Sequence, residues 1–175
     1  MRVMTMMVAA VLLAAPAWSQ ELPVPGVAAA RDVPNAKELP NPKTEYKVLF
    51  DAVTGAAKPT EVDGMLTATA RYLNTLAKHG VPPANRKIAV IFHGAGTPAI
   101  LTNEEYRRRY NGADNPNIPL IQALKKAGVA FHVCGQAVLG AKIDQKDILP
   151  EIQVDLWALT TIVNLQLQGY VRVGG

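Results

Sequence analysis

The sequence predicts a three-layer α/β domain of the flavodoxin-like type, in which helices cover both faces of a mostly parallel five-stranded sheet. Two near-continuous apolar runs, at residues 87–92 and 129–133, are typical of strands that are buried on both faces. Segments with helical periodicity lie between the apolar runs along the chain. Strands that alternate with helices at this short period form parallel sheets through right-handed crossovers.

Turn-forming residues set the limits of the expected elements. Gly80 and the Pro82-Pro83 pair end the first helix, and Gly128 and Gly169 end two later ones. The expected strands cover residues 46–50, 87–92, 129–133, 152–156 and 170–173. The expected helices cover residues 61–78, 102–110, 119–127, 136–142 and 157–167.

The first 19 residues have the pattern of an export signal. Arg2 precedes an apolar stretch at residues 3–15, which is too short to span a membrane comfortably, and small residues follow it. We expect cleavage after Ser19, with Ala17 as the second choice, and a periplasmic mature protein. Membrane attachment is expected only through an uncleaved signal. A proline-rich extended arm at residues 20–43 then leads into a domain at residues 44–175.

Composition and missing motifs exclude several functional classes. With 49% hydrophobic and 18% charged residues, the chain is neither disordered nor fibrous. The only basic run, at residues 107–109, lacks interleaved aromatic residues, so we expect a solvated helix face and no nucleic acid. The glycines form neither a dinucleotide fingerprint nor a phosphate-binding loop, and no cofactor is expected. Ser19, the only serine, lies in the signal region, which excludes a serine hydrolase.

Cys134 is the only cysteine, and it stands where a predicted strand gives way to a helix. Amide groups at a helix start favour a thiolate, and His132 is expected on the same sheet face. His93 and Gly94 follow another strand, and ligands in parallel sheets bind beyond the strand carboxyl ends. The candidate catalytic residues are therefore Cys134, His93 and His132, and the candidate pocket residues are Gly94, Gly135 and Gln136.

Other interpretations of these residues stay open. An unpaired cysteine in an exported chain is a buried apolar residue, an intermolecular crosslink or a reactive thiol. Cys134 with His93 and His132 has the ligand types for a metal site, but no closely spaced pair supports one, and no metal is expected. A cysteine hydrolase needs an acidic residue to orient the histidine, and the sequence does not locate one.

Four segments together resemble exported DsrE/DsrF-like proteins over residues 46–173. These segments are residues 87–94, residues 115–124, residues 129–136 and residues 165–170. The resemblance implies a YchN-like fold that assembles into homotrimers or homohexamers. It also implies that Cys134 matches a cysteine that carries sulfur as a persulfide. The chain departs from relay members after this cysteine, where it has Gly140-Ala141-Lys142 instead of an Arg-Gly pair.

The leading functional hypothesis is a sulfur carrier, resembling a sulfurtransferase, that receives sulfur on Cys134 from a donor and passes it to an acceptor protein or small thiol. The alternative is a non-catalytic oligomeric module that binds a small ligand in a pocket lined by Cys134. A third hypothesis is a redox-responsive or metal-responsive thiol.

Overall fold

The computed structural model describes residues 21–175 of the chain. The expected signal at residues 1–19 lies outside the described residues.

Five parallel strands form one sheet, as the sequence predicts, in the order β4-β3-β2-β1-β5. Their bounds are β1 Tyr46–Ala52, β2 Arg86–Phe92, β3 Ala130–Cys134, β4 Gln153–Asp155 and β5 Val171–Gly174. The predicted fold class, a parallel α/β sheet with helices on both faces, is confirmed.

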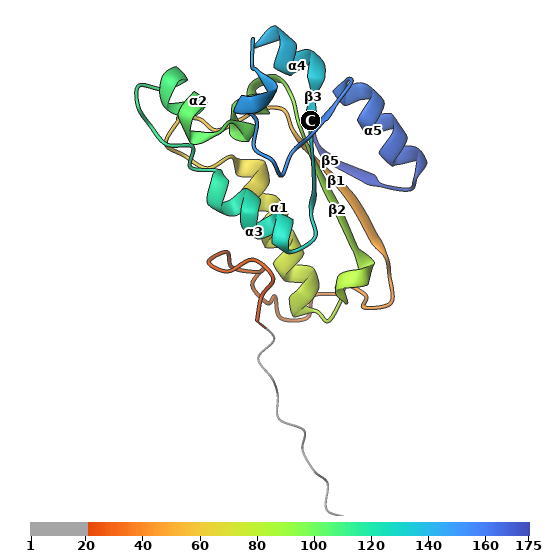
Figure 1. The fold of residues 1–175 in the computed structure, drawn as a ribbon. Coiled ribbons are helices and arrows are strands. Elements are labelled where there is room, and N and C mark those ends of the chain that lie inside the picture. Colours follow the sequence, from red (N-terminus) through yellow and green to blue (C-terminus); the bar gives the residue numbers. More distant parts are fainter. Residues whose placement is uncertain (1–20) are drawn as a thin grey trace, which may run out of the picture.

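Two apolar clusters show how the helices divide between the faces of the sheet (Figure 1). The larger cluster joins the sheet to α1 (Gly64–Lys78), α3 (Ile118–Lys126) and α4 (Gly135–Gly140), while the smaller one joins it to α5 (Ala158–Leu167). Strands β1, β2, β3 and β4 lie side by side in sequence order across the sheet. The chain then crosses back over the sheet and places β5 on the other side of β1. A right-handed crossover in the reverse direction puts its helix on the opposite face, so α5 covers this face.

The loops after β1 and β2 pack tightly against each other at the carboxyl edge of the sheet. A 3-10 helix at Gly94–Ile100, which the sequence analysis did not predict, follows β2 directly. A Cβ atom on Gly96 would lie 2.0 Å from the carbonyl oxygen of Ala52, so only glycine fits there. Helix α1 begins at Gly64, three residues later than predicted, because the Asp63 side chain accepts a hydrogen bond from the amide of Met65 and caps the helix.

The short helix α2 (Asn103–Arg109) carries the basic run that the sequence shows at residues 107–109. Arg108 and Arg109 both pair with the buried carboxylate of Glu105, and Arg107 pairs with Asp114. Burial alone would raise the pKa of Glu105, but hydrogen bonds and charge from Arg109 and Arg108 outweigh burial and hold that pKa below its ordinary value. Most of the positive charge of this run is therefore paired within the domain.

The proline-rich arm packs on its own domain. Residues 21–45 form no helix or strand, as expected, yet Val24 is fully buried against α1. The amide side chain of Asn74, itself buried, accepts a hydrogen bond from the Val24 amide at 2.9 Å and donates to the carbonyl oxygens of Val24 and Val27.

Among the described residues, no helix is both long and apolar enough to cross a membrane.

Replacing Asn74 with alanine should release this arm from α1. The change removes three hydrogen bonds and leaves the buried Val24 amide without an acceptor, so the free energy of unfolding should fall by about 1–3 kcal/mol. Urea unfolding measures this loss, and limited proteolysis should show faster cleavage before Thr44. Asn85→Ala is the matched control, because the Asn85 side chain makes an exposed hydrogen bond to Pro42. Equal effects of both substitutions would contradict a specific role for Asn74.

Candidate functional site

Cys134 is the last residue of β3, and two strand neighbours flank it at the carboxyl edge of the sheet. Asp155 of β4 is its partner in the ladder on one side. On the other side the ladder pairs Phe92 with Val133, so the next residues along these strands are His93 and Cys134. Side chains alternate between sheet faces, which places His93, His132 and Cys134 together on the face that α5 covers.

His93 is held by a buried carboxylate at the end of β1. Asp51 is completely buried, and its Oδ1 lies 2.7 Å from Nε2 of His93. The guanidinium group of Arg172 on β5 binds the other oxygen, with Nε 2.8 Å from Oδ2. Three neighbouring strand ends therefore supply one hydrogen-bonded row, Arg172–Asp51–His93, whose last residue lies next to Cys134 in the register of the sheet.

His132 is held in the same manner from the other side. Its Nδ1 lies 2.9 Å from Oδ2 of Asp155, which also accepts a 2.6 Å hydrogen bond from the hydroxyl of Thr161 on α5. Gln153 donates to Oδ1 of the same carboxylate at 2.7 Å. Asp155 therefore ties α5 to the strand that carries Cys134.

These contacts fix the chemistry that the two imidazoles can perform. An ionised carboxylate only accepts hydrogen bonds, so it favours the histidine tautomer with a proton on the facing nitrogen. Nδ1 of His93 and Nε2 of His132 are then the nitrogens with a free lone pair. Among the described residues, no hydrogen bond joins Cys134 to either histidine, so an imidazole can accept the thiol proton only when the two side chains approach each other.

The thiol of Cys134 is less accessible than we expected from the sequence. A strand-end position predicts a solvent-reachable sulfur, but Cys134 is only 4% exposed. The side chain packs in the smaller apolar cluster with Ala158 and Ile162 of α5. The expectation fails because α5 crosses this face of the sheet and covers the strand end, so a reagent reaches the sulfur only if α5 moves.

The candidate pocket residues do not line one common cavity. Gly135 and Gln136 line a hollow of about 510 Å³ together with Asp155 and Leu156, and Cys134 and Gly94 are not part of its wall. Gly135 is required at this position because a Cβ atom would lie 2.5 Å from the carbonyl oxygen of Asp155. Gly94 has φ +55° and turns the chain away from β2 toward Val53.

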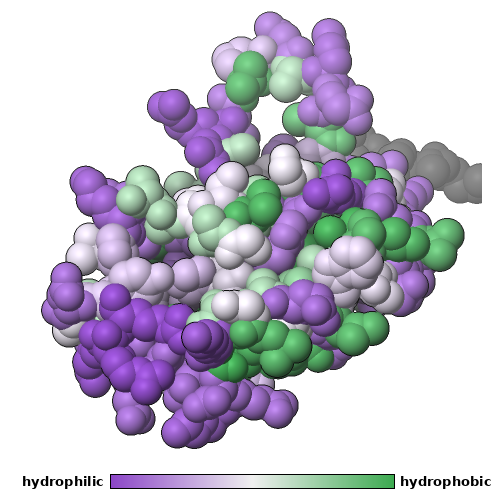
Figure 2. All heavy atoms as spheres, turned by 90° about the horizontal axis from the view of Figure 1, so that it is seen from above, coloured by the Kyte–Doolittle hydropathy of each residue, from purple (hydrophilic) through white to green (hydrophobic). Residues whose placement is uncertain are grey.

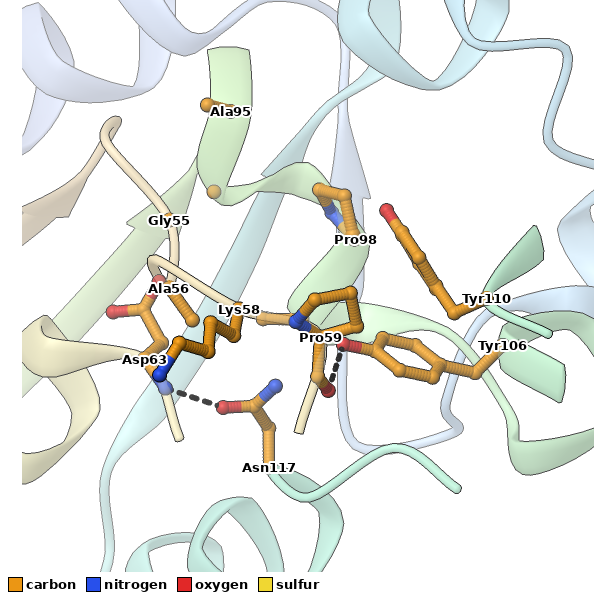
Figure 3. A pocket seen from close by; sticks show the side chains of 12 residues that line it. Gly55, Ala56, Lys58, Pro59, Asp63, Ala95, Pro98, Tyr106, Tyr110 and Asn117 are labelled. Carbon is orange, nitrogen blue, oxygen red and sulfur yellow. Dashed lines mark hydrogen bonds between the residues drawn. The ribbon is translucent and has the colours of Figure 1, made fainter. Parts of the chain in front are cut away.

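A separate small cavity lies between the loops after β1 and β2, and Figure 3 shows its lining. Its volume is about 90 Å³, which is room for a few water molecules. The hydroxyl of Tyr106 donates to the carbonyl oxygen of Pro59 at 2.8 Å, and the Asp63 amide donates to Asn117 at 2.7 Å. The cavity contains none of the residues that the sequence analysis selected.

Asp51, Asp155 and Arg172 are functional-site residues that were not expected from the sequence. Asp51 follows the apolar stretch of β1, and a carboxylate at a strand end was a detectable signal for a site residue. The pairing itself depends on strand order, since Arg172 reaches Asp51 only because β5 lies beside β1. Within residues 21–175, no group of three or more His, Cys, Asp or Glu side chains is arranged to hold a metal ion.

Comparison with known proteins gives a family match and similar solved structures. The family model described as the DsrE/DsrF-like family matches residues 47–173. A solved structure, that of the protein of unknown function MTH1491 from Methanobacterium thermoautotrophicum, aligns with a TM-score of 0.50 and 20% identity over 73% of this chain and 99% of that chain. That likeness supports the fold alone.

No curated protein matches the chain. The family match covers well over half of the sequence and confirms the resemblance found from the residues. The chain belongs to the DsrE/DsrF-like family.

Proposed function

We propose that this protein is a periplasmic sulfur carrier in which Cys134 accepts a sulfane sulfur and passes it to an acceptor thiol. Membership of the DsrE/DsrF-like family indicates a function related to sulfur relay. The observation that carries the proposal is the position of the only cysteine at the end of β3, with carboxylate-held His93 at the end of the neighbouring strand and carboxylate-held His132 two residues before it. Export of the mature chain rests on the signal pattern of residues 1–19.

The proposed reaction has two steps that leave the protein unchanged. The Cys134 thiolate attacks the outer sulfur of a donor persulfide, forming the Cys134 persulfide and releasing the donor thiolate. An acceptor thiolate then attacks that outer sulfur, forming the acceptor persulfide and restoring the Cys134 thiolate. His93 or His132 accepts the thiol proton at the start, and no external oxidant or reductant is consumed.

Burial of the thiol sets a requirement for this chemistry. Because Ala158 and Ile162 pack beside Cys134, the donor gains access only when α5 moves from the strand end. The hydrogen bond from Thr161 to Asp155 is one of the contacts that such a movement breaks. In a single chain, opening of this surface helix is a local event that costs less than global unfolding, whereas in an oligomer joined through α5 the interface has to open as well.

Sulfur loading tests the proposal directly, because every persulfide on this chain must form at one residue. Incubation with glutathione persulfide, followed by removal of small molecules, should add the mass of one sulfur atom, as measured by intact-mass spectrometry. Dithiothreitol should remove that mass again. The Cys134→Ala variant, which we expect to fold, should gain none.

The same burial favours a different interpretation of Cys134, as a buried apolar residue of the core rather than a residue that carries sulfur or lines a ligand pocket. This alternative predicts no sulfur gain at neutral pH. It also predicts that Cys134→Ala lowers the free energy of unfolding by about 1 kcal/mol or more through the cavity it leaves. Incubation with the donor without a gain in mass, combined with this loss of stability, would show that Cys134 is a structural residue and that the sulfur-carrier proposal is wrong.

We further propose that α5 joins copies of the chain into a homo-oligomer. Its inner side packs on the sheet, yet its outer side presents Leu159, Val163 and Leu167, which are 51%, 44% and 81% exposed. Trp157 and Leu156 continue this apolar surface. Apolar residues gather at the right of Figure 2, the side on which α5 lies in Figure 1. A helix that is apolar on both sides is typical of an interface.

A further inference from the structure

A hollow of about 560 Å³ opens at the opposite end of the sheet from Cys134, where β2 begins. Its walls come from three parts of the chain that are distant in sequence: the proline-rich arm, the turn before β2 and the end of α3. The apolar wall residues are Leu22, Pro23, Pro25, Pro83, Ala123 and Ala127. The packed arm therefore forms one side of a cavity of the size that small ligands occupy.

Arg86, the first residue of β2, supplies a guanidinium group to the wall of this hollow. Its Nε and Nη1 atoms are buried, and neither has a hydrogen-bond partner in the part of the chain that the structure describes. Burial lowers the pKa of Arg86 below its ordinary value, which reflects the cost of removing the cation from water. Arg86 as a whole is only partly buried, and within residues 21–175 no ion pair includes it, so this part of the chain supplies no counter-ion for its charge.

The charges around Arg86 favour an anion. Lys126, the last residue of α3, supplies a second cation to the lining, and Glu21 supplies the only carboxylate. No ion pair joins Glu21 to Arg86 or Lys126 among the described residues. The lining therefore holds an excess of positive charge, and part of that charge is buried.

We propose that this hollow binds a small oxyanion through Arg86 and Lys126. A guanidinium group presents donors in a planar fork that matches the oxygens of a carboxylate, phosphate or sulfur oxyanion, whereas an ammonium group acts as a point charge. The prolines and alanines suit a ligand with a short apolar body. This inference does not depend on sulfur transfer, since it concerns the other end of the sheet.

Calorimetric titration of the whole mature protein with inorganic phosphate, thiosulfate and succinate tests this site and separates the three sources of oxyanion. At least one probe should bind with one-to-one stoichiometry. Arg86→Lys should weaken that binding about tenfold, because it keeps the charge but removes the fork. Lys126→Gln should also weaken it, while Glu21→Gln should strengthen it. Lys125→Gln, which removes the neighbouring charge of α3 outside the hollow, is the matched control.

Thermal unfolding of the Arg86→Met variant is a second test that does not depend on calorimetric titration. Methionine fills similar space without a buried charge, so this variant should unfold at a higher temperature than the wild type in anion-free buffer. It should also gain no stability from the bound probe, whereas the wild type should. The proposal is overturned if no probe binds, if Lys125→Gln weakens binding as much as Lys126→Gln, or if Arg86→Met binds as the wild type does. An Arg86→Met protein that unfolds at a lower temperature in anion-free buffer would likewise overturn it.

Discussion

Replacing Asp51 with alanine should lower the free energy of unfolding by about 3 kcal/mol and slow sulfur loading of Cys134 about a hundredfold. Asp51 is fully buried and compensates both His93 and Arg172, so its removal leaves two donors without an acceptor. This loss of unfolding free energy is at the lower end of the range for breaking a buried ion pair, because the side chains of His93 and Arg172 are 24% and 39% exposed. Urea unfolding and the time course of mass gain measure the two effects.

The rate effect of Asp51 has to be separated from its effect on stability. His93→Gln removes the base but keeps a side chain that can donate to Asp51, so it should slow loading with a smaller loss of stability. If Asp51 acts through His93, Asp51→Ala should slow the His93→Gln variant little further. Asp114→Asn is the surface control, because its exposed pair with Arg107 contributes little to stability. If Asp51→Ala slows loading of the His93→Gln variant as much as it slows loading of the wild type, Asp51 is only structural.

The fold could be predicted from the sequence because the apolar runs and the turn residues indicate the same boundaries for the strands and helices. The run in β2 is buried on both faces, whereas in β3 Phe131 and Val133 are buried and Ala130, on the other face, is exposed. The glycines after α3 and α5 end those helices where expected. The 3-10 helix at Gly94–Ile100 was missed, since its position depends on the close approach of Gly96 to Ala52 across two loops. Such packing between loops has no periodic signal in the sequence.

The candidate site could be predicted only in part. The strand ends predict that Cys134, His93 and His132 lie near one another, because carboxyl ends of parallel strands meet at one edge. The partners of these histidines depend on strand order, which sequence patterns did not determine. The same reversal that puts β5 beside β1 sends α5 across the strand end, and this crossing explains why Cys134 is buried rather than solvent-reachable.

The second large effect concerns assembly through α5. Replacing Val163 with glutamate should convert the proposed homo-oligomer into monomers at micromolar concentration. Val163 lies in the centre of the outer stripe, between Leu159 and Leu167, one helical turn from each. A carboxylate placed at the centre of an apolar interface loses its hydration without gaining a partner, which should weaken association by about thirtyfold or more. Light scattering coupled to size-exclusion chromatography measures the mass of the assembly.

Asn164→Glu adds the same charge to the next residue of α5, about 100° around the helix, and should leave the assembly intact. Both side chains are exposed in the single chain, so the unfolding free energy of a monomer should change by only about 0.5 kcal/mol in either variant. A loss of assembly in both variants would indicate a general charge effect rather than an interface at the stripe. A wild-type protein that is monomeric at this concentration would instead leave the outer surface of α5 free, and the proposed assembly would be wrong.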